Sequence, residues 1–124
     1  MLHNQLYMDN KQFSQKLEQR TKKFALQVIQ LSSQLPNTLE ARVVRNQITK
    51  SGTSVGANYR EANRARSRAD FINKIKICEG EASETQYWLE ILIEPNWLPK
   101  EKVTPSYDEC SQLLALFTSI GKNN

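Results

Sequence analysis

The sequence has few of the residues that make tight turns, and it lacks long apolar runs. Its 124 residues include only four glycines and four prolines, too few for the many turns of a β-sandwich. The apolar runs are only a few residues long, so no segment is expected to cross a membrane. The N-terminus has no basic start followed by an apolar block, and a secretory signal is not expected. These absences favour a single cytoplasmic domain over residues 1–124.

Histidine and cysteine are also scarce. The single histidine is His3, and no Glu-x-x-His pair exists, so the inward-facing ligands of a di-iron helical bundle are missing. A Ser-His-Asp or Cys-His catalytic set needs a placed histidine as well, and no Gly-Lys-Ser/Thr motif makes a phosphate loop. Cys78 and Cys110 lie on apolar stripes and are expected to be buried thiols rather than a disulfide. We therefore expect no catalytic residue, no metal, no cofactor and no small-molecule substrate.

Helical periodicity accounts for most of the chain. Apolar residues follow the spacing of one helix face in four segments, at about 10–34, 38–65, 68–94 and 105–120. In the third segment, apolar and small residues from Phe71 to Leu92 repeat at alternating steps of four and three, the seam of a helical bundle. The connections are short, which makes neighbouring helices antiparallel. The sequence predicts an all-α, up-down-up-down four-helix bundle.

Capping signals indicate where the four helices begin. Each is a polar side chain that can accept a hydrogen bond from the first turn, or a proline at the first helical position. They are the pairs Asp9 and Gln12, Asn37 and Glu40, Ser67 and Asp70, and Thr104 and Pro105. The residues before Asp9 would then form an arm outside the first helix.

The stretch from Ser51 to Ala62 is rich in small residues, yet it keeps the helical spacing of its flanks. Gly52 and Gly56 each cost about 1 kcal/mol of helix propensity relative to alanine. Close packing against another backbone would offset that cost, and a kink is the alternative. Folding the second helix against the third places Gly80 near Ser51 and Gly52. We interpret the stretch as the slender waist of a long helix.

Positive and negative charges are unevenly distributed. The formal net charge is +4, but Glu40–Lys76 holds nine basic and three acidic residues. The next segment, Ile77–Glu94, holds five glutamates and no base. Such segregation favours binding to a polyanion, pairing between neighbouring helices, or both.

The antiparallel pairing of the second and third helices predicts specific ion pairs. Arg45 is expected within about one turn of Glu84, and Lys50 near Glu81. The glutamates of the third helix would then partly neutralise the bases of the second.

Several other polar and aromatic positions have a structural interpretation. Asn58 lies on the apolar stripe and is expected to form a hydrogen bond inside the bundle or between subunits. Glu61 borders the stripe and is expected to pair with Arg64 or with a base of a neighbouring subunit. The alternative is that Asn58 and Glu61 contact a ligand. Tyr87 and Trp88 are interpreted as core or interface aromatics rather than stacking platforms for bases.

A cluster of bases surrounds the turn between the second and third helices. Arg60, Arg64 and Arg68 would lie on one side of a continued helix, Arg66 lies in the turn, and Lys74 follows. Cations are favourable at a helix C-terminus, but this does not account for Arg68, which lies near an N-terminus. These five residues are the candidate nucleic-acid contacts. No base-reading module is visible, so recognition by backbone charge or shape is expected.

These motifs match a known family over most of the chain, from about Phe13 to Ile120. The matching residues are Leu35-Pro36, Arg42, Gln47, Ser51–Asn58, Glu61-Ala62, Asp70-Phe71, Lys74, Glu81-Ala82 and Glu84–Leu89. The chain resembles the bacterial four-helix-bundle proteins encoded by intervening sequences in 23S rRNA genes, also called S23-type proteins. The accessory variability determinant of diversity-generating retroelements belongs to the same group.

The resemblance implies a homopentameric barrel that binds nucleic acid through a basic surface. For the retroelement members it also implies partnership with a reverse transcriptase. Two functional hypotheses follow. The first is a non-enzymatic, homo-oligomeric accessory protein that binds RNA or DNA, and the alternative is a protein-binding scaffold whose charged faces serve assembly.

Overall fold

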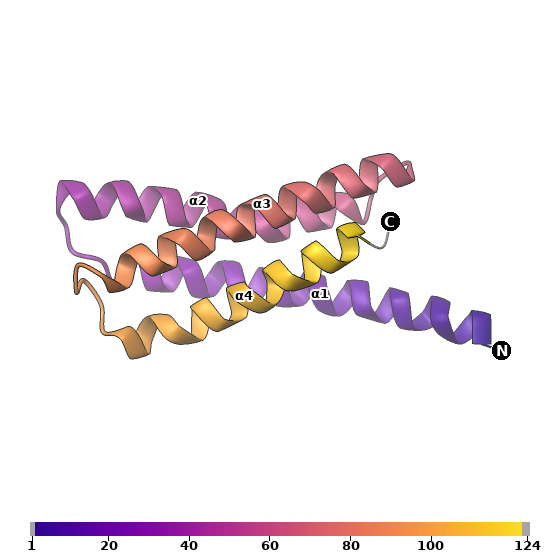
Figure 1. The fold of residues 1–124 in the computed structure, drawn as a ribbon, viewed down its shortest axis with the longest axis horizontal. Coiled ribbons are helices and arrows are strands. Elements are labelled where there is room, and N and C mark those ends of the chain that lie inside the picture. The colour runs from indigo at the N-terminus through magenta and orange to yellow at the C-terminus, as the bar shows by residue number, and fades with distance from the viewer. Residues whose placement is uncertain (1, 123–124) are drawn as a thin grey trace.

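The protein consists of four long helices. The computed structural model describes the backbone of residues 2–122 and the side chains from Asn10 to Lys122. Within these residues there is no strand, and the helices are α1 (Leu2–Ser32), α2 (Leu39–Ala62), α3 (Arg68–Ile93) and α4 (Lys100–Lys122). Successive helices run antiparallel, and the N-terminal part of α1 extends past the α2–α3 turn (Figure 1). The prediction of an all-α chain with four helices is confirmed.

The helices enclose one apolar core. α2 packs between α1 and α3, while α4 packs mainly on α3 and approaches α1 more narrowly. α1 and α3 therefore lie diagonally across the bundle. In the part of the core near the ends of α2 and α4, the rings of Tyr59 and Phe117 lie 5.6 Å apart between centroids. No described helix combines the length and apolar character needed to cross a bilayer.

The predicted seam of α3 faces this core. Ile75, Cys78, Ala82, Thr85, Leu89 and Leu92 are all buried, and Phe71 is half-buried. Thr85 Oγ1 donates to Ser51 Oγ at 2.9 Å, and Cys78 Sγ lies 3.5 Å from the Val55 carbonyl oxygen, so both contacts join α3 to α2. Cys110 Sγ lies 3.2 Å from the Ala82 carbonyl oxygen and joins α4 to α3. As predicted, Cys78 and Cys110 are buried free thiols.

One of the predicted helix starts matches the structure and the others differ. The Ser67 hydroxyl accepts from the Asp70 backbone N–H at 3.0 Å, as expected of an N-cap. At α2 the cap is Thr38 rather than Asn37, because Thr38 Oγ1 accepts from the Ala41 N–H. α1 continues to Leu2 without a start at Asp9, and the side chains of residues 1–9, including His3, lie outside the described part. α4 begins at Lys100, and Pro105 lies inside it.

The waist of α2 is helical, as predicted, but it packs on α1 rather than on α3. A Cβ atom on Gly52 would lie 2.8 Å from Val28 Cγ1, and one on Gly56 would lie 3.0 Å from Thr21 Oγ1. Thr21 is fully buried and its hydroxyl donates to the Leu17 carbonyl, so it has little freedom to move. The expected contact of Gly80 with the waist is wrong: Gly80 is exposed. Two residues can lie at the same level along the bundle and still be on helix faces that do not meet.

Candidate nucleic-acid interface

The candidate interface is the turn between α2 and α3, at one end of the bundle. We call its five bases the basic tip; they are Arg60, Arg64, Arg66, Arg68 and Lys74. The four arginines are exposed and Lys74 is half-buried. The backbone of the turn is ordered by hydrogen bonds from the N–H of Arg64 to the Glu61 carbonyl and from the N–H of Ala65 to the Ala62 carbonyl. The short turn therefore holds several cations close together at the surface.

Most cations of the basic tip have no partner in the described part of the chain. Among the described side chains, none forms a hydrogen bond or ion pair with Arg64, Arg66, Arg68 or Lys74. An anion could therefore bind these guanidinium and ammonium groups without displacing an acid. Arg60 differs, because its Nε lies 3.8 Å from Glu18 Oε1 and its charge is partly screened.

A groove between α1 and α2 extends from the basic tip along the bundle. It has a volume of about 480 Å³ and is lined by Glu18, Lys22, Ala25, Thr53, Gly56, Ala57, Arg60 and Glu61. Glu18 also accepts a hydrogen bond from Asn63 Nδ2 at 2.8 Å, so it ties α1 to the end of α2. Neither Lys22 nor Glu18 was predicted from the sequence to be a site residue. Their spacing of four on α1 places them on one face, but nothing in the sequence showed that this face borders Arg60.

The predicted ion pair between Arg45 and Glu84 is wrong. Arg45 lies on the side of α2 that faces α1. There its guanidinium donates to the carbonyl oxygens of Ser32, Leu35 and Pro36 at 3.2, 2.9 and 3.2 Å. Ser32 ends α1, and Leu35 and Pro36 belong to the connection to α2, so the guanidinium of Arg45 binds the backbone where the chain leaves α1.

The glutamates of α3 are not neutralised by α2. Glu84 Oε2 accepts from Trp88 Nε1 at 3.1 Å within the same helix. The two ion pairs of the described part involve neither Glu81 nor Glu84, and Lys50 is in neither pair. Glu81 is half-buried, and its backbone carbonyl accepts from Thr85 Oγ1. Among the described residues, α3 therefore presents an acidic surface without counter-ions.

Asn58 and Glu61 lie at the surface of α2 rather than in its buried stripe, and their predicted contacts with a neighbouring subunit stay predictions. Asn58 is only half-buried, and its amide donates to the Ser54 carbonyl one turn earlier in α2. Tyr59, the next residue, occupies the core position instead. Glu61 is exposed and makes no ion pair with Arg64 among the described residues. It lines the α1/α2 groove described above.

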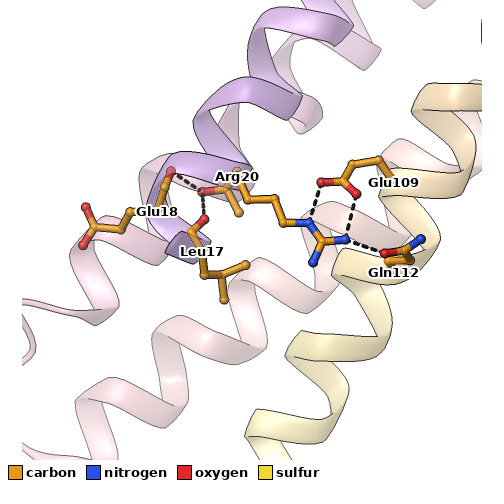
Figure 2. Close-up of polar contacts among 6 residues, drawn as sticks. Leu17, Glu18, Arg20, Glu109 and Gln112 are labelled. Carbon is orange, nitrogen blue, oxygen red and sulfur yellow. Dashed lines mark hydrogen bonds and ion pairs between the residues drawn. The ribbon is translucent and has the colours of Figure 1, made fainter. Parts of the chain in front are cut away.

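An ion pair that the sequence did not predict joins α1 to α4 (Figure 2). Arg20 Nε lies 2.6 Å from Glu109 Oε2, and its Nη2 donates to Glu109 Oε1 at 2.7 Å and to Gln112 Oε1 at 2.6 Å. The hydrogen bonds that Arg20 donates to the Glu109 carboxylate raise the pKa of Arg20 above its ordinary value, and the guanidinium is charged at every physiological pH. The contact holds together the narrow seam between the first and last helices.

The fold and its surface define a class: a four-helix protein with a basic tip at one end and an acidic surface along α3. No group of three or more His, Cys, Asp or Glu residues in the described part could hold a metal ion. The family model for the 23S rRNA-intervening sequence protein matches residues 13–119, and the chain belongs to this family.

One solved structure is similar to this chain over nearly the whole length of the solved protein. It is that of a protein with unknown function from the S23 ribosomal protein family, from Bacteroides thetaiotaomicron VPI-5482. The two sequences are 41% identical, the TM-score is 0.79, and the match covers 85% of this chain and 97% of that one. A search of curated proteins found no match.

Proposed function

We propose that the chain is a non-enzymatic, homo-oligomeric accessory protein of the cytoplasm that binds RNA or DNA through the basic tip. The observation that carries this function is that Arg64, Arg66 and Arg68 are exposed within five positions and have no partner among the described side chains. Guanidinium groups are strong phosphate ligands, and binding several phosphates releases counter-ions from the nucleic acid.

Recognition is by charge and shape rather than by base sequence. The exposed ring of Tyr87 and the half-buried ring of Trp88 lie near the other end of α3, with centroids 5.0 Å apart in an edge-to-face arrangement. Aromatic rings that stack on bases need to lie beside the phosphate contacts. The basic tip offers mainly flexible cationic side chains, which suit the sugar-phosphate backbone.

Assembly would strengthen this binding. The resemblance to S23-type proteins supports a homopentamer, in which several basic tips act on one nucleic acid and avidity multiplies a weak single contact. It also supports partnership with a reverse transcriptase where the gene lies within a retroelement. One observation favours the second candidate function, a protein-binding scaffold: the acidic surface of α3 has no counter-ion in the part of the chain that the structure describes.

A pair of matched charge reversals tests the nucleic-acid function. Structured RNA and a DNA duplex are titrated by fluorescence anisotropy at several salt concentrations. Arg64→Glu/Arg68→Glu is compared with Lys100→Glu/Lys102→Glu, which makes the same charge change on exposed residues at the opposite end of the bundle (Figure 1).

The expected result is loss of binding in the first variant and near wild-type binding in the second, with helical content unchanged in both. Absence of wild-type binding even at low salt refutes the nucleic-acid function and leaves the scaffold. Equal loss in the two variants shows that net charge, rather than the basic tip, controls binding.

A further inference from the structure

Gly80 has no explanation within a single chain. It lies in the middle of α3, it is exposed, and a Cβ atom there would meet no atom within 4 Å. No described glycine has a positive φ, so the backbone conformation does not require glycine either. Glycine lowers helix propensity more than any residue except proline. Such a residue is useful where a group from outside the chain approaches the helix backbone closely.

Apolar side chains flank Gly80 on the same surface. Ile77 is 44% exposed and Tyr87 is 54% exposed, and their spacings of three before and seven after Gly80 place all three on one helix face. Glu84 lies between Gly80 and Tyr87 on this face. We call Ile77, Gly80, Glu84 and Tyr87 the α3 outer face. This face is acidic and partly apolar, and at its centre Gly80 leaves a space without a side chain.

A complementary surface exists on α1 of the same chain. Leu26 is 59% exposed and Ile29 is 44% exposed, and Lys22 lies one turn before Leu26. We call Lys22, Leu26 and Ile29 the α1 outer face. Since α1 and α3 are diagonal in the bundle, the two faces point away from each other and cannot meet within one chain.

The two outer faces lie at the same height along the bundle. Gly52 of α2 faces Val28 of α1, and Val55 of α2 contacts Cys78 of α3. Leu26 lies two residues before Val28, and Gly80 lies two residues after Cys78. Because α1 and α3 both run antiparallel to α2, each of these steps leads to the level of residues 53–54 of α2. Leu26 and Gly80 are therefore level, and α1 and α3 run in the same direction (Figure 1).

We propose that the α3 outer face of one copy binds the α1 outer face of a second copy, with Leu26 of the second copy seated over Gly80. The apolar groups meet at the centre, and Lys22 of the second copy lies beside the glutamates of α3. A symmetric contact between two α3 faces would instead oppose two sets of glutamates, which repel each other.

This contact is head-to-tail, so it leaves one free face of each kind and can repeat, and a rotation at each contact closes the array into a ring. The inference rests on the self-association included in the proposed function and identifies the surfaces that make it. It also links assembly to nucleic-acid binding. Covering the α3 glutamates removes a surface that repels phosphates, and assembly brings several basic tips together.

Three variants test the contact by light scattering. Gly80→Arg fills the gap, Leu26→Ser removes the inserted side chain, and Ala115→Arg adds the same charge as Gly80→Arg at an exposed position of α4. Circular dichroism checks that each variant remains helical. We expect the mass of a single chain for the first two variants and the mass of the assembled wild type for Ala115→Arg.

The same variants are titrated with a labelled DNA duplex. Although Gly80→Arg adds a positive charge, we expect it to bind at least about tenfold more weakly than Ala115→Arg, because avidity is lost. If the wild type assembles and both Gly80→Arg and Leu26→Ser assemble equally well, the proposed contact is wrong while the proposed function stands. If the wild type itself is a single chain that still binds the duplex, assembly is wrong and the basic tip acts alone.

Discussion

Arg20 on α1 and Glu109 on α4 form the ion pair that joins the first and last helices, and no other ion pair does so among the described residues. The guanidinium makes a bidentate contact with the carboxylate, and the side chains of Arg20 and Glu109 are 34% and 22% exposed. The seam that they bridge is the narrowest helix–helix contact of the bundle. We therefore expect this pair to contribute more to stability than an isolated surface ion pair does.

A double-mutant cycle with Arg20→Ala and Glu109→Ala measures this contribution. Forked, charge-assisted pairs are stronger than single surface ion pairs, but partial exposure limits the gain, so we expect a coupling free energy of about 1 kcal/mol in urea denaturation. Lys23→Ala, an exposed position on the same helix, should leave stability within about 0.5 kcal/mol of wild type. Strict additivity of the two substitutions would contradict an energetic role for the pair.

The interaction of Arg45 with the end of α1 gives a second prediction. Arg45→Ala removes three hydrogen bonds to the carbonyl groups of Ser32, Leu35 and Pro36, and we expect a loss of about 1–3 kcal/mol in the free energy of unfolding. Arg45→Lys should recover only part of it, because an ammonium group does not reproduce the fork of the guanidinium. If Arg45→Lys had the same free energy of unfolding as the wild type, the positive charge alone would account for the stabilisation of the connection between α1 and α2.

Alanine substitutions at the glycines of α2 and α3 should have opposite effects. Gly52→Ala places a Cβ atom 2.8 Å from Val28 Cγ1, and we expect a loss of about 1–2 kcal/mol after the gain in helix propensity is included. Gly80→Ala meets nothing and should stabilise the folded chain by about 0.5–1 kcal/mol. Both are measured by urea denaturation in the Leu26→Ser background, so that assembly does not contribute. A destabilising Gly80→Ala in that background would show that the glycine serves the single chain.

The buried thiols predict a loss of stability at high pH. Burial raises the pKa of Cys78 and of Cys110 from 9.0 to about 12, and burial also raises the pKa of Tyr59. Because the fold favours the neutral forms, their stabilising effect is complete below about pH 9 and is lost as the pH rises toward 12. We expect the urea midpoint to fall between pH 8 and pH 10.5. The fall should be smaller in Cys78→Ala/Cys110→Ala, and an equal fall would exclude the thiols as its cause.

Patterns that repeat along a helix were predicted correctly from the sequence. The α3 seam, the Ser67 cap and the helical waist each depend on local spacing, and spacing alone determines which residues share a face. Relationships between helices were harder to predict. The position of the turn predicts which residues of two antiparallel helices lie at the same level along the bundle. The rotation of each helix about its own axis depends on how the whole core packs.

That rotation explains the wrong ion pair in the candidate site. Arg45 and Glu84 were paired by height, yet Arg45 faces α1 and Glu84 bonds to Trp88 within α3. The misplacement of Asn58 has a different cause: the buried stripe of α2 steps by four from Val55 to Tyr59, where a step of three to Asn58 was expected. The cluster of arginines at the basic tip did not depend on rotation, because residues in a short turn are exposed whichever way the helices face.

The central claim is that the basic tip binds phosphates, and the salt dependence of duplex binding tests it most directly. Each arginine that contacts a phosphate contributes about 0.9 to the slope of log K against log salt concentration. Arg64→Gln/Arg68→Gln and Lys100→Gln/Lys102→Gln remove equal charge from opposite ends of the bundle. We predict a shallower slope and weaker binding only for the arginine variant. The same slope for wild type and the arginine variant would contradict the assignment of the basic tip as the phosphate-binding surface.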